Sequence, residues 1–157
     1  MIGKIELVIG NQKQELDPDS ELSISEETIN DDLKNQPSLF AFYAVMQENM
    51  EADVAEKKLH LDALEAMLDE MYRTEAAKSG TKITETLLAN KIHINQEYID
   101  AASLLNKAKH EANVLRAIKE AFQHRKDMLI TLASNMRAQF DPAICMNKEK
   151  YQKMGEK

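Results

Sequence analysis

Histidine and cysteine are the side chains that most often bind metals or act as nucleophiles, and their spacing here favours neither role. The histidines are His60, His93, His110 and His124, and the single cysteine is Cys145. A helical di-iron site needs a glutamate three residues before its ligating histidines, and no histidine has one. No HExxH motif, Gly-rich phosphate loop or Ser/Cys nucleophile motif occurs either. We therefore expect a protein that is not an enzyme and has no metal or cofactor.

Basic residues form a second group that could do chemistry, by binding an anion. Four of them share one flank of a long predicted helix in its heptad frame: Lys109, Arg116, Lys119 and Lys126. No acidic residue of that helix falls on the same two heptad positions, so the stripe could follow the phosphates of a nucleic acid. The alternative is that Lys119 and Lys126 bridge to Glu51 and Glu65 of a neighbouring helix.

Arg125 is unusual because it occupies an apolar position of the same helix, between Ile118 and Leu132. In the structural interpretation its aliphatic stem packs in the core while its guanidinium meets a carboxylate of another helix. Folding the chain back as a hairpin would place it opposite Glu48 or Glu51. In the functional interpretation it contacts DNA or another ligand at a hairpin end. We favour the structural role.

The helix that positions these residues covers 101–136. Apolar residues recur there every seventh position, with a second series three residues later, and no Gly or Pro interrupts them. The first series is Ala101, Ala108, Leu115, Phe122, Leu129 and Met136, and the second is Leu104, Ile118 and Leu132. The pattern predicts a long amphipathic helix, capped by Asn95 and ending near residue 140 before Asp141-Pro142.

A first long helix is predicted from Pro37 to about residue 79, with Gly80 at its C-terminal cap. Its apolar seam is Leu39, Phe42, Met46, Met50, Val54, Leu61, Leu64, Leu68 and Met71. A short helical or irregular connector over 83–92, with Thr84 as its candidate cap, joins it to the second helix. The chain is therefore expected to be mainly α, with a long antiparallel helical hairpin over 36–140.

The first 35 residues form a separate, acidic appendage in this interpretation, with nine acids and three bases in a chain of net charge −7. Alternating apolar residues predict strands over 4–9 and 12–16, followed by a turn at 17–19 and a short helix over 25–34. A polar break at 35–38 ends it, and a Lys-rich tail covers 141–157. The appendage is either a solvated arm or an autoinhibitory or partner-docking arm that mimics nucleic-acid charge.

Apolar residues beyond the two seams predict self-association, because a two-helix hairpin buries one stripe per helix. On the first helix they are Phe40, Tyr43, Leu59 and Met67. On the second helix the predicted homo-oligomer interface is Val114, Ala121, Phe122 and Met128.

Composition suggests where such a protein works. A lone cysteine forms no intrachain disulfide, which is typical of a reducing compartment. No signal peptide and no apolar run near 18 residues is evident in the sequence. We expect a soluble, cytoplasmic protein, in the host cytoplasm if the chain is encoded by a phage.

Residues 117–130 read AIKEAFQHRKDMLI, a Phe-x-x-Arg followed by an apolar turn. This resembles the end of the second helix in the phage recombination mediator family (UvsY-like). The start of the predicted second helix, Gln96-Glu97-Tyr98, and the polar and aliphatic connector over 84–92 are also similar. The resemblance covers roughly residues 36–140.

The resemblance implies a ring-forming helical protein. Such a protein binds single-stranded DNA, helps displace the single-strand binding protein and loads a RecA-like recombinase. The acidic first 35 residues depart from the family, as does 65–70 (EAMLDE), which is acidic where the family tends to be basic. Only Arg73, Lys78 and Lys82 offer comparable charge beyond it.

The expected DNA-binding set combines the basic stripe with two residues near the connector: Lys109, Arg116, Lys119, Lys126, Arg73 and Lys82. The expected function is that of a non-enzymatic recombination mediator. The alternative is a helical assembly factor or chaperone with protein partners only.

Overall fold

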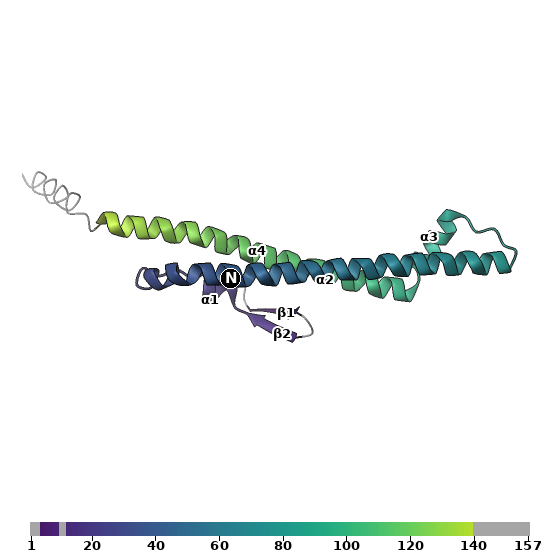
Figure 1. Ribbon diagram of the computed structural model, residues 1–157, viewed down its shortest axis with the longest axis horizontal. Coiled ribbons are helices and arrows are strands. Elements are labelled where there is room, and N and C mark those ends of the chain that lie inside the picture. The colour runs from purple at the N-terminus through teal and green to yellow at the C-terminus, as the bar shows by residue number, and fades with distance from the viewer. Residues whose placement is uncertain (1–3, 10–11, 140–157) are drawn as a thin grey trace, which may run out of the picture. The chain divides into compact units, whose positions relative to one another are not determined.

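The computed structural model describes the backbone of residues 4–9 and 12–139, and the side chains of 4–6 and 15–139. Two strands, β1 (Ile5–Ile9) and β2 (Gln12–Leu16), precede four helices: α1 (Pro18–Leu22), α2 (Ile29–Lys78), α3 (Glu85–His93) and α4 (Gln96–Gln139). The two long helices, α2 and α4, pack antiparallel (Figure 1). This confirms the mainly helical hairpin fold and its small N-terminal sheet.

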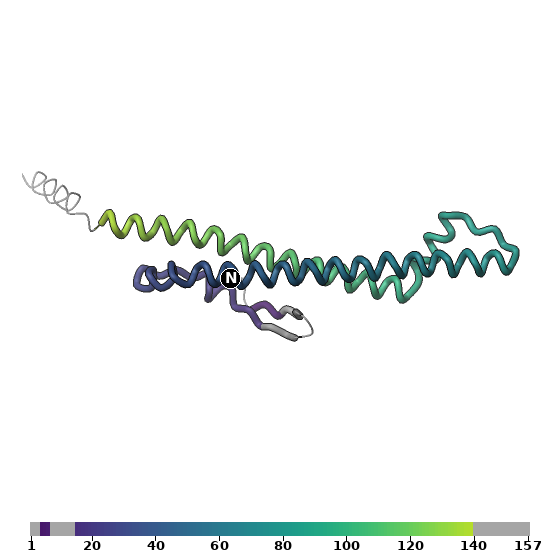
Figure 2. The backbone as a smooth tube through the Cα atoms, viewed as in Figure 1, coloured from purple at the N-terminus to yellow at the C-terminus, as the bar shows by residue number. Residues whose placement is uncertain are grey.

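The chain divides into two compact units. In the described residues, the arm unit contains 4–6, 14–43 and 117–139, and the connector unit contains 44–116 with the strand segments 7–9 and 12–13. Each long helix contributes to both units (Figure 2). The described N-terminal residues 4–6 and 14–28 share a unit with the start of α2 and the second half of α4.

The buried stripe of α4 follows the predicted seven-residue series from Ala101 to Leu129, and Met136 is half-buried. Leu104 was wrongly assigned to the seam: it is 56% exposed, and Leu105 is buried instead. The buried residues step by four and three up to Leu115 and by three and four after it: Ala101, Leu105, Ala108, Ala112, Leu115, Ile118, Phe122, Arg125 and Leu129. The second buried series therefore lies four residues after the first series before Leu115 and three residues after it from Leu115 onward. This is a local departure from one constant heptad frame.

The α2 seam is confirmed at Met46, Met50 and Leu68, all of which are buried. Phe42 is 48% exposed, whereas Tyr43, which the seam excluded, is fully buried. The Tyr43 ring stacks on Phe122 with a centroid distance of 4.7 Å and an interplanar angle of 22°. Such aromatic contact adds to burial of apolar area, which explains why Tyr43 displaces its neighbour from the core.

The predicted break at 35–38 is absent, and α2 runs through Pro37. An interior proline removes a backbone donor and disfavours the helical conformation of the residue before it. That residue, Gln36, is buried and donates from Nε2 to the Phe122 carbonyl oxygen at 2.6 Å. Its Oε1 accepts from Arg125 at 2.7 Å. These tertiary hydrogen bonds hold Gln36 in the helix despite the proline.

The N-terminal segment confirms both predicted strands, but residues 17–19 do not form a simple turn. They begin α1, with Asp17 as the N-cap that accepts from the Ser20 amide and Pro18 at the first helical position. The short helix predicted over 25–34 is instead the beginning of α2, which starts at Ile29 after Thr28. The Tyr43 hydroxyl donates to Glu21 at 2.9 Å, tying α1 to α2.

Arg125 is buried, with 3% of its side chain exposed. Its Nη1 donates to Gln36, and its Nη2 donates to the Ser23 carbonyl at 3.0 Å and to Asp32 Oδ1 at 2.7 Å. The partner carboxylate is therefore Asp32 and not Glu48 or Glu51. A buried guanidinium needs several acceptors, and the N-terminal segment and the start of α2 supply them together.

Asp32 has a perturbed carboxyl group as a result. Partial burial acts to raise its pKa, but hydrogen bonds from Thr28 and Arg125 and the charge of Arg125 outweigh it and hold the pKa below the ordinary value of 3.8. The ionised form of Asp32 is thus favoured in the folded protein.

The connector unit ends α2 with a complete glycine cap. Gly80 has φ +66°, its amide donates to Ala77 and the Thr81 amide donates to Ala76, the two bonds of a Schellman motif. Thr84 caps α3 through the Leu87 amide, as predicted. The face of α3 packs on α2 through a buried cluster of Leu68, Leu88 and Ile92. Asn95 accepts from the Glu97 and Tyr98 amides at the start of α4, which confirms its capping role.

Replacing Arg125 with alanine should destabilise the protein by about 3 kcal/mol, because Asp32 and Gln36 lose a buried partner. Urea unfolding followed by circular dichroism would measure this. Arg137→Ala is the matched control, because that arginine is exposed and, among the described residues, donates only to a backbone carbonyl of its own helix. It should change stability by less than about 0.5 kcal/mol. Equal losses in the two variants would contradict the buried role.

The Asp32 carboxylate should make stability depend on acid pH. Its folded pKa lies below the unfolded value, so its contribution is present above about pH 4 and is lost as the pH falls through the folded pKa. At pH 7 the wild type should unfold at higher urea than Asp32→Asn, and this difference should shrink toward pH 3. A difference that stays constant from pH 7 to pH 3 would show that ionisation of Asp32 contributes nothing.

Candidate nucleic-acid interface

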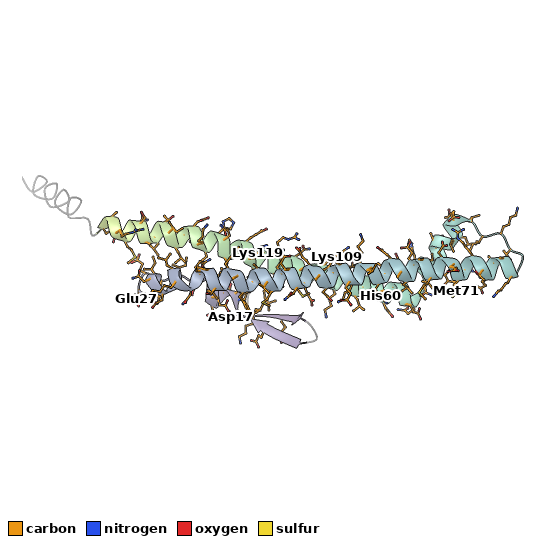
Figure 3. The ribbon with its side chains drawn as sticks, in the orientation of Figure 1. Asp17, Glu27, His60, Met71, Lys109 and Lys119 are labelled. Atoms are coloured by element: carbon orange, nitrogen blue, oxygen red, sulfur yellow. The ribbon has the colours of Figure 1, made fainter. Side chains whose placement is uncertain are left out.

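A groove of about 520 Å³ lies between α2 and α4 in the connector unit. Its lining contains three basic side chains, one acid and small or apolar residues: Lys58, Lys109, Arg116, Glu51, Val54, Ala55, Ala112 and Asn113. Lys109 and Arg116 belong to the predicted basic stripe, and Lys58 is contributed by the opposite helix. Lys109 is labelled on α4 in Figure 3. The structure therefore brings cations from both long helices to one surface.

An ion pair between α2 and α4 shows which residues of the two helices lie opposite one another in this groove. Arg116 Nη2 donates to Glu51 Oε1 at 2.8 Å, and the same oxygen accepts from Gln47 at 2.7 Å. Lys58 follows Glu51 by seven residues and Lys109 precedes Arg116 by seven. In an antiparallel pair, equal steps in opposite directions meet again two turns along. Lys58 and Lys109 are consequently placed across the groove from one another.

The positive charges of Lys58 and Lys109 are not balanced by acidic side chains within the described residues. Neither Lys58 nor Lys109 makes an ion pair or hydrogen bond among the described residues, and both are exposed. Glu51 is the one carboxylate of the described lining, and it already binds Arg116. Two facing ammonium groups repel each other, so an anion bound between them would relieve that repulsion. The groove suits a phosphate, with an apolar floor beside it.

The remaining stripe residues, Lys119 and Lys126, belong to the arm unit. Their bridging to Glu51 and Glu65 stays a prediction, while Glu51 forms an ion pair with Arg116 at 2.8 Å. Lys126 Nζ lies 3.3 Å from the carboxylate of Asp127, an acid that the heptad frame assigned to another direction. The long, flexible side chain of Lys126 reaches its sequence neighbour here, a contact that a count of heptad positions does not predict.

Arg73 and Lys82 differ sharply in their surroundings. Arg73 donates to Asp69 of its own helix at 2.7 Å and to both carboxylate oxygens of Glu85 at 2.7 and 3.0 Å. These hydrogen bonds raise the pKa of Arg73 and lower that of Glu85. Arg73 is therefore an α2–α3 clamp with its guanidinium occupied, while Lys82 is exposed in the segment between the helices.

The predicted oligomer interface is only partly exposed. Phe122 has no exposed surface, because it forms the core of the arm unit with Tyr43, so it cannot offer its ring to a second chain. Val114 and Ala121 are half-buried, whereas Met128 is 63% exposed. The predicted oligomer interface therefore combines one core residue, Phe122, with three residues that are at least partly exposed.

Within the described residues, no three or more His, Cys, Asp or Glu side chains gather where they could hold a metal ion. In the same part of the chain, no helix combines the length and apolar character needed to cross a membrane. Cys145 and the predicted tail over 141–157 lie outside the described residues.

Sequence reasoning missed Lys58. The heptad repeats indicate which faces of the two helices meet, but several registers bury those faces about equally well. The complementary charges of Glu51 and Arg116 are the sequence signal that identifies the register of the two helices.

The sequence has no match among protein-family models and no significant match to a curated protein or a solved structure.

The Arg73 clamp predicts a specific loss of order. Arg73→Ala should increase hydrogen exchange of the α3 backbone amides, because the link between Glu85 and α2 is removed. Hydrogen exchange measured by mass spectrometry would show it. Lys82→Ala is the control, since Lys82 makes no ion pair in the described structure and should leave α3 protection unchanged. Unchanged exchange in Arg73→Ala would show that the clamp is dispensable.

Proposed function

We propose that this protein is a non-enzymatic recombination mediator that binds single-stranded DNA and helps load a RecA-like recombinase. The groove with Lys58, Lys109 and Arg116 is the observation that carries the proposal. The resemblance of residues 117–130 and of the start of α4 to phage recombination mediators supports it. In this proposal the displaced single-strand binding protein and the recombinase are its protein partners, and copies of the chain assemble into a homo-oligomer.

The groove suggests how a strand would be held. Its cations contact phosphates, which read no base sequence, and no aromatic side chain is present among the described lining residues to stack a base. Binding should therefore be weak per subunit and independent of sequence. A homo-oligomer would repeat the groove, so modest contacts would add through effective concentration.

Charge reversal on one helix tests the proposal with a close control. Lys109→Glu and Lys107→Glu change the same charge two residues apart on α4, but only Lys109 lines the groove. Lys109→Glu should weaken binding of a fluorescent oligothymidine at least tenfold at low salt, and Lys107→Glu by less than threefold. The slope of log affinity against log salt should fall by about 0.7 for each phosphate that the variant no longer neutralises. Equal weakening would mean that only net charge matters.

Neutralising the groove's acid should act in the opposite direction. Glu51→Gln removes the one carboxylate of the described lining, and with it the negative charge that would repel a phosphate, so affinity should rise severalfold. Fluorescence anisotropy with the same oligonucleotide measures it, with Glu48→Gln as the control because Glu48 lies on α2 outside the lining. If the wild-type protein shows no binding to oligonucleotides even at low salt, the mediator proposal is wrong.

The second candidate is an assembly factor or chaperone with protein partners only. It is favoured by large apolar side chains that stay exposed in the connector unit, such as Val45, Leu59 and Leu104. The oligonucleotide titration separates the two candidates, because this one requires no affinity for nucleic acid.

A further inference from the structure

The last three turns of α2 carry an open pocket of about 830 Å³. Its described lining comes entirely from this helix: Met67, Glu70, Met71, Tyr72, Thr74, Glu75 and Lys78. None of these residues lines the basic groove, so the two surfaces are separate. Met71 is labelled on α2 in Figure 3.

Two methionines give the pocket its apolar character. Met67 is 68% exposed and Met71 is 50% exposed, and they lie one turn apart, so they form a continuous contact surface. Methionine is flexible and polarizable, and exposed methionines are common on surfaces that accommodate helical partners. The residues facing the core at this level, Leu64 and Leu68, are packed against α3 and leave these two free.

The described lining of the pocket carries a net negative charge. Glu70 and Glu75 line it, and their carboxylates make no ion pair or hydrogen bond among the described residues. Lys78 is the single cation of the described lining. Over 44–78, α2 carries nine acids and four bases, so the surroundings share this sign. The pocket would repel a phosphate backbone and attract a basic surface.

We propose that this pocket docks a basic amphipathic helix of a partner protein. The methionines would receive apolar side chains spaced at three and four residues, and Glu70 and Glu75 would pair with lysine or arginine on the flanks of that helix. A second copy of the same face is a poorer occupant, because two copies would bring together twice as many carboxylates as ammonium groups. This inference stands independently of DNA binding.

A designed peptide supplies the probe. A fluorescein-labelled 14-residue peptide that repeats Leu-Lys-Lys-Leu-Leu-Lys-Leu presents the stated chemistry, and the same peptide with glutamate for lysine is its control. The full chain should bind the basic peptide at micromolar concentration and the acidic peptide at least tenfold more weakly. Equal binding of both peptides would overturn the charge complementarity.

Matched variants locate the binding. The double variant Met67→Gln, Met71→Gln should weaken peptide binding at least tenfold, while Met128→Gln, which removes a methionine of similar exposure from α4, should leave it unchanged. Glu70→Lys should weaken it at least fivefold and reduce its salt dependence, whereas Glu65→Lys, on α2 outside the lining, should change it less than twofold. Circular dichroism confirms that each variant is folded.

Two results would overturn the proposal. Pocket variants that bind the peptide no more weakly than their controls would place binding elsewhere. Sedimentation in which the double methionine variant loses self-association while Met128→Gln keeps it would show that a second copy covers the pocket. Oligonucleotide affinity should be the same in the double methionine variant and the wild type, which keeps this test separate from that of the basic groove.

Discussion

The arm unit depends on burial of the Arg125 guanidinium. Arginine keeps its charge in proteins, so a buried guanidinium is tolerated only where acceptors surround it. Ser23, Asp32 and Gln36 provide them, and they come from the segment before α2 and from its first turns. Residues in this segment are therefore part of the folded unit. Removing residues 1–35 would therefore leave Arg125 without two of its acceptors, Ser23 and Asp32.

The same network explains why the local signals at 35–38 were misleading. Proline and polar residues normally mark a boundary, and by local preference α2 would begin there. Gln36 instead uses both ends of its amide, one toward Phe122 and one toward Arg125. These buried hydrogen bonds oppose the cost of an interior proline. Boundaries that depend on contacts nearly ninety residues apart in sequence are outside the reach of local patterns.

Periodicity predicted the long helices and most of their buried faces, and residue type predicted their capping residues, because these features depend on local geometry. Asn95, Thr84 and Gly80 were identified from residue type alone, and the structure gives each the expected role. The register between α2 and α4 was not predictable in this way. Heptads repeat, so shifting one helix by seven residues changes the buried area little, and the contacts that fix the register are few and specific. Tyr43 on Phe122 and Arg116 on Glu51 are two of them.

That error in register is also why the basic groove was incompletely predicted. The sequence identified Lys109 and Arg116, but the matching lysine on α2 follows only from knowing which residues face each other.

The net charge of the chain was a poor guide to the charge of its surfaces for a related reason. In the connector unit α2 is acidic as a whole, yet Lys58 lies on the side facing α4, while Glu70 and Glu75 line a different pocket. Coulomb interactions are screened within about 10 Å at 0.1 M salt, so a bound ligand responds to the nearby charges and not to the total of −7. α2 can therefore line a groove whose cations come mostly from α4 and also carry an anionic pocket of its own, so ligands of opposite charge need not compete for the same surface.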